Sequence, residues 1–164
     1  STLRRIGFSL ASATLGFAAG RVVEGAVIGA VIGIAQAIAL PTTFSRKTWW
    51  VLGSTLAWAV AWSAGWSLGW SLFGGLGLRM VFVLMGAMAG TLAGIVQWLV
   101  LRGQVPRAGL WLLANTLGWA AGMGLAMMLR QVGWIAGGAV GGAITGLPLL
   151  WLLRGAGPQR MPSA

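Results

Sequence analysis

The chain has 164 residues, of which 58% are hydrophobic and 7% are charged, and its formal net charge is +10. An ordinary soluble domain has about 25% charged residues, so the composition excludes a soluble globular protein and predicts an all-α integral membrane protein. Cysteine and histidine are absent, and Glu24 is the only acid. These absences remove thiol chemistry, Cys/His metal sites and paired-carboxylate catalysis, so we expect neither catalytic residues nor a metal site.

Apolar runs separated by short polar or glycine-rich breaks predict six membrane helices in a single transmembrane domain covering residues 1–164. The predicted helices cover residues 6–20, 25–40, 48–73, 80–101, 108–129 and 132–153, and a polar tail follows at 155–164. Crossing a hydrocarbon core of ~30 Å takes about 20 helical residues. Residues 6–20 are therefore short for a span, and one tilted helix over 6–40 would give five spans instead. Because the apolar character continues past this run, we interpret it as a membrane helix and not as a cleaved signal peptide.

The basic residues lie singly or in pairs between apolar runs, which is typical of contact with anionic lipid headgroups and not of nucleic-acid binding. Six spans place eight basic residues on one side and three on the other. The two groups are Arg4, Arg5, Arg46, Lys47, Arg102, Arg107, Arg154 and Arg160, against Arg21, Arg79 and Arg130. Five spans give a weaker division of six against four, with Arg21 inside the membrane. The positive-inside rule therefore favours six spans with both termini in the cytoplasm.

A repeated pattern predicts three helical hairpins, at approximately 6–47, 48–107 and 108–154. In each hairpin a helix containing a Thr-Leu pair precedes a helix with glycine at every fourth position. Such glycines share one helix face and let two backbones approach closely in lipid, so we expect GxxxGxxxG rows to pack the hairpins together. The predicted packing residues are Gly25, Gly29 and Gly33, then Gly86, Gly90 and Gly94, and finally Gly138, Gly142 and Gly146.

A row of tryptophans and a few polar residues are the remaining candidates for a site. Trp58, Trp62, Trp66 and Trp70 follow one another at intervals of four. They form an aromatic strip that can pack inside the protein or against lipid, or contact a partner helix, a quinone, a carotenoid or another flat apolar molecule. The polar candidates are Arg21, Glu24, Gln36, Gln97 and Asn115. They can be interhelical hydrogen-bonding groups, or they can line a transport pathway.

These observations favour a non-catalytic membrane subunit that packs against other membrane proteins, lipids or apolar cofactors in a larger complex, for example an energy-transducing or photosynthetic one. The alternative is a small-solute transporter or its substrate-binding component. A transporter should have a polar cavity near the membrane midplane, lined by Arg21, Glu24, Gln97 or Asn115. A packing subunit should have a dry interior and an open apolar face.

Overall fold

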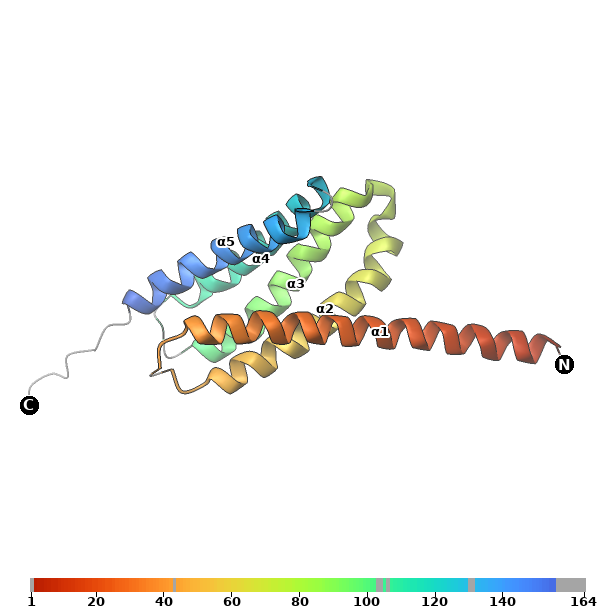
Figure 1. The fold of residues 1–164 in the computed structure, drawn as a ribbon, viewed down its shortest axis with the longest axis horizontal. Coiled ribbons are helices and arrows are strands. Elements are labelled where there is room, and N and C mark those ends of the chain that lie inside the picture. Colours follow the sequence, from red (N-terminus) through yellow and green to blue (C-terminus); the bar gives the residue numbers. More distant parts are fainter. Residues whose placement is uncertain (1, 43, 103–104, 106, 130–131, 156–164) are drawn as a thin grey trace, which may run out of the picture.

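The computed structural model describes residues 2–42, 44–102, 105, 107–129 and 132–155. These residues form five long helices and one short 3-10 helix, and the described part contains no strand (Figure 1). In chain order the elements are α1 (Thr2–Ala39), α2 (Lys47–Phe73), η1 (Gly74–Leu76), α3 (Leu78–Leu101), α4 (Gly109–Met128) and α5 (Gly133–Gly155).

Four stretches are long and apolar enough to cross a membrane: Gly16–Ala39 within α1, and Leu78–Leu101, Gly109–Met128 and Gly133–Trp151. α2 has 27 residues and is therefore about 40 Å long, although several serines and tryptophans lower its hydropathy. The fold is that of a helical, multi-pass integral membrane protein.

The six-helix arrangement is not found, because residues 6–20 and 25–40 belong to one continuous helix, α1. Residues 21–24 between them contain two charges but no proline, and each of the flanking glycines, Gly20 and Gly25, costs a helix only about 1 kcal/mol. Arg21 Nη1 also lies 2.8 Å from Glu24 Oε2, so the two charges pair along the helix and do not interrupt it. The first predicted hairpin is thus a single helix, and five crossings would place the two termini on opposite sides.

Proline and glycine do end other helices. Pro41 follows the end of α1, and Gly77 has φ 83° directly before α3, a conformation that favours glycine. Pro148 lies inside α5 without ending it, as membrane helices tolerate when neighbouring groups satisfy the freed carbonyl.

Each helix packs mainly on its neighbours in the chain, so the helices form an array in the order α1 to α5. The N-terminal half of α1 extends beyond the other helices (Figure 1). Near the loops 40–46 and 102–108 the helix ends share one buried core cluster, in which Leu149 of α5 joins Ala37, Leu40, Trp50 and Trp111. A second buried cluster lies farther from these loops, around Trp58, Trp62, Phe82 and Met123.

Candidate functional site

A buried hydrogen-bond network connects four helices at Gln97, which is 1% exposed. Gln97 Nε2 donates to Gln36 Oε1 and to Ser54 Oγ, each at 2.8 Å. Gln97 Oε1 accepts from Trp111 Nε1 at 2.9 Å, and Gln36 Oε1 accepts from Trp50 Nε1 at 3.2 Å. Two of the predicted polar residues therefore meet, and the Gln97 amide is bonded at both of its ends.

Trp50 and Trp111, which were not among the predicted site residues, are both fully buried. Their rings lie 5.5 Å apart between centroids. The sequence contains a pattern that could have identified them, because each tryptophan follows its hydrogen-bonded glutamine by 14 residues.

Asn115 lies apart from this network and packs against α3. Its side chain is 1% exposed, and Nδ2 donates to the Trp111 carbonyl one turn earlier at 3.2 Å. The neighbouring Thr116 forms a 2.9 Å hydroxyl–hydroxyl hydrogen bond with Thr91 of α3. Asn115 and Thr116 thus lie at the α3–α4 contact.

Arg21 and Glu24 lie at the contact between α1 and α2. Trp62 Nε1 donates to Glu24 Oε2 at 3.1 Å, and the Arg21 guanidinium lies 4.9 Å from the ring centroids of both Phe17 and Trp66. Ion pairing and cation–π contact both lower the cost of a charge near the bilayer. The five predicted polar residues therefore belong to three separate places and do not converge on one site.

The first two glycine rows lie in direct helix contacts. A Cβ added to Gly25 would lie 2.7 Å from Trp62 Cβ, and one added to Gly29 would lie 2.5 Å from the Ser54 carbonyl oxygen, so α1 approaches the α2 backbone. In the same way Gly86 meets the Trp119 carbonyl and Gly90 meets the Asn115 carbonyl on α4. Gly33 and Gly94, the last member of each row, also touch the following helix.

The third glycine row differs from its prediction. A Cβ added to Gly138, Gly142 or Gly146 would meet no atom within 4 Å. α5 instead packs on α4 through the adjacent face, where Gly137 approaches the Gly122 carbonyl and Gly141 approaches that of Gly118. The expected periodicity is present in α5, but the contact uses the row one residue earlier, and the predicted row is open.

The first members of the tryptophan row face the interior of the protein. Trp58 is 1% exposed and Trp62 is 8% exposed, while Trp66 is half-buried against Phe82 with ring centroids 6.0 Å apart. The side chain of Trp70 lies outside those that the structure describes. The row therefore does not form an outward strip at Trp58 and Trp62, where it lines the interior.

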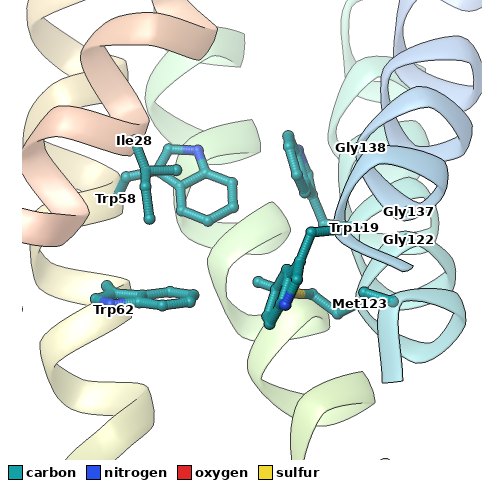
Figure 2. Close-up of a pocket in the computed structure, with 10 residues that line it drawn as sticks. Ile28, Trp58, Trp62, Trp119, Gly122, Met123, Gly137 and Gly138 are labelled. Atoms are coloured by element: carbon teal, nitrogen blue, oxygen red, sulfur yellow. The ribbon is translucent and has the colours of Figure 1, made fainter. Parts of the chain in front are cut away.

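An apolar cleft, which we call the tryptophan cleft, lies between the α1–α2 pair and the α4–α5 pair and has a volume of about 180 Å³. Figure 2 shows Ile28, Trp58 and Trp62 on one side of it and Trp119 with the glycines of α4 and α5 on the other. Its lining consists of Ile28, Trp58, Trp62, Trp119, Gly122, Met123, Ala126, Trp134, Gly137 and Gly138. Trp119, Met123 and Trp134 were not among the predicted site residues, and Trp119 could have been found because it stands 61 residues after Trp58, as Gln97 does after Gln36.

Two indole N–H groups in the tryptophan cleft lack an acceptor. Trp58 Nε1 and Trp119 Nε1 are buried and have no hydrogen-bond partner among the described residues. The two rings meet edge to face, with centroids 4.6 Å apart and planes at 78°. One N–H directed at the other ring can gain only a weak interaction, so at least one of the two donors stays buried without a strong hydrogen bond to the described residues.

A second, shallower groove runs along the outer surface between α2 and α3. Its lining includes Trp49, Leu52, Leu56 and Leu99, with Arg46 among the lining residues at the loop before α2. A cation beside an apolar channel is the pattern that a phospholipid headgroup and acyl chain would match.

The chain matches no protein-family model, no curated protein and no solved structure.

Proposed function

We propose that the chain is a non-catalytic membrane subunit that holds a helix of another membrane protein against the open glycine row of α5. The observation that carries the proposal is this row, in which Gly138, Gly142 and Gly146 meet nothing within 4 Å. In lipid, helices associate mainly through close packing, and small residues at every fourth position favour it.

Corresponding rows elsewhere in the chain support this proposal. Gly86, Gly90 and Gly94 precede the α5 row by 52 residues, and all three are covered by α4. The row of α1 is covered by α2 in the same manner. If the pattern is a true internal repeat, α5 presents the surface to which a following helix binds in the two earlier cases.

A second copy of this chain is a poor occupant for that surface. The helices that cover glycine rows, α2 and α4, each already pack between two neighbours. A second copy in the same conformation would therefore offer only α1 or α5. We infer that the covering helix belongs to a different membrane protein.

Lipids and apolar cofactors complete the proposed set of partners. The groove at Arg46 and Trp49 suits a lipid, and the tryptophan cleft suits an apolar molecule. We propose no nucleic-acid partner, since the basic residues are distributed between apolar segments and do not form a stripe.

The transport alternative has less support. It requires a polar cavity near the midplane, but the tryptophan cleft is apolar and includes none of Arg21, Glu24, Gln97 or Asn115. Gln97 is also hydrogen-bonded through both ends of its amide.

The proposal is tested by purifying the tagged chain from its native membrane in mild detergent and resolving the product by native mass spectrometry. We expect the wild-type chain to co-purify with a larger assembly. Gly142→Leu with Gly146→Leu should reduce that co-purification at least tenfold, because leucine prevents close approach of the covering helix.

Ala143→Leu is the matched control, since it adds the same side chain to an exposed position of α5 outside the row. It should leave the assembly intact. Recovery of the wild-type chain only as a monomer or as a homo-oligomer would refute the proposal, as would an assembly that tolerates both glycine substitutions.

A further inference from the structure

We propose that the tryptophan cleft binds a neutral, planar molecule with a carbonyl oxygen, of the quinone class. The inference rests on the proposed function only in treating the chain as a binding subunit within the membrane. It concerns a neighbouring surface, which shares Gly138 with the open row of α5 but not Gly142 or Gly146.

The lining of the tryptophan cleft determines the charge of the ligand that it accepts. None of the residues that line the tryptophan cleft is ionisable, so the cleft has no partner for a charged group, and burying an unpaired charge in apolar surroundings is strongly unfavourable. A neutral molecule is therefore the occupant that the lining accepts.

The indole N–H groups of Trp58 and Trp119 need a hydrogen-bond acceptor. An indole N–H can only donate, and the side chains of Trp58 and Trp119 beside the cleft each carry a buried N–H with no hydrogen-bond partner among the described residues. The interior of a bilayer has no bulk water to satisfy them. A ligand with a carbonyl oxygen would supply the acceptor that a hydrocarbon lacks.

The shape of the tryptophan cleft suits a flat ring. The cleft combines aromatic walls at Trp58, Trp62 and Trp119 with a side formed by Gly122 and Gly137, whose backbones carry no side chains. Flat rings pack well against such surfaces in offset or edge-to-face geometry. A cavity of about 150 Å³ in another protein accommodates benzene, so about 180 Å³ suits a single substituted ring.

A ligand can reach the tryptophan cleft from the side at which Trp134 lies. Trp134 also lines the cleft and is 50% exposed, so this side chain lies where the cleft meets the surroundings. An apolar tail attached to the ring can leave beside Trp134 and continue into the lipid, while the ring stays between the helices.

The experiment uses the full chain, purified in detergent, with two probes that share one tail: a decyl-substituted benzoquinone and decylbenzene. A ligand that binds the folded state raises its thermal unfolding midpoint. We expect a saturable rise with the quinone at a concentration at least tenfold lower than with decylbenzene.

Trp58→Phe combined with Trp119→Phe keeps two aromatic rings and removes both N–H groups. The double variant should need about tenfold more quinone for the same rise, the factor that corresponds to about 1.4 kcal/mol, and its response to decylbenzene should not change. The two single variants provide the same comparison if the double variant does not fold. Trp151→Phe, at an exposed tryptophan outside both the cleft and the groove between α2 and α3, is the matched control and should behave as wild type.

Gly138→Leu tests the location independently of the tryptophans. Its Cβ meets no atom within 4 Å, so the variant should fold, and its side chain should compete for the space of the ligand and weaken both probes. Equal responses of the wild-type chain to the quinone and to decylbenzene would overturn the inference. So would an unchanged quinone response in the double tryptophan variant, and either result would leave the docking proposal for α5 unaffected because no partner protein is present.

Discussion

Gln97 is a buried side chain that forms hydrogen bonds to three other helices. It bonds to Gln36 of α1, to Ser54 of α2 and to Trp111 of α4 while belonging to α3 itself. Interhelical hydrogen bonds in membranes contribute about 0.6 to 2 kcal/mol each. One residue therefore connects helices that share little direct packing, as α1 and α3 do.

Replacing this amide gives a prediction at the level of one residue. Gln97→Leu should lower the free energy of unfolding by about 1–3 kcal/mol, because the indole N–H of Trp111 would remain buried without its acceptor. Titration of the purified chain with a denaturing detergent, followed by tryptophan fluorescence, measures the change. Ile95→Ala, at an exposed position of the same helix, should change stability by less than about 0.5 kcal/mol. Equal effects of the two substitutions would contradict the role given to the network.

Two glycines at corresponding positions of α3 and α5 give a prediction about helix contacts. Gly90 meets the backbone of Asn115, whereas Gly142 meets nothing within 4 Å. Gly90→Ala should therefore destabilise the isolated chain by about 1–3 kcal/mol through overpacking. Gly142→Ala serves as its control and should be neutral or slightly stabilising, because alanine favours the helix. The same detergent titration compares them, and a similar loss in both variants would show that α5 is covered.

Helices α2 to α5 could be predicted from the sequence, because apolar length is a local property, and the four-residue period of the glycines can be read there in the same way. The continuity of α1 could not be read from charge counting, which treated Arg21 and Glu24 as a loop. Their 2.8 Å ion pair is compatible with a helix as well as a turn. The face of α5 that contacts α4 could not be predicted either, because Gly137 and Gly141 have the same four-residue spacing as Gly138 and Gly142. The tryptophan cleft depends on how helices that are distant in the sequence approach one another. The sequence indicates it only through the 61-residue interval between Trp58 and Trp119.

The arrangement of five helices gives a prediction for the whole molecule. Successive crossings would place the loop before α2 and the turn after it on opposite sides, with the loop on the more basic, cytoplasmic side. Because the chain has no cysteine, Ser45→Cys and Leu76→Cys each provide one exposed thiol. A membrane-impermeant maleimide should label Leu76→Cys in intact cells and Ser45→Cys only after the membrane is opened. Labelling of both from the same side would show that α2 does not cross.

The neighbour-to-neighbour contacts of the array also bear on how the protein is made. A ribosome delivers helices to the membrane in chain order, and here each new helix finds its main partner in the one that came just before it. Such local connectivity lowers the loop-closure entropy of each step and favours rapid, stepwise assembly. Biogenesis can therefore proceed helix by helix, and α5 then has one side packed on α4 while its open glycine row stays available to a helix that arrives later.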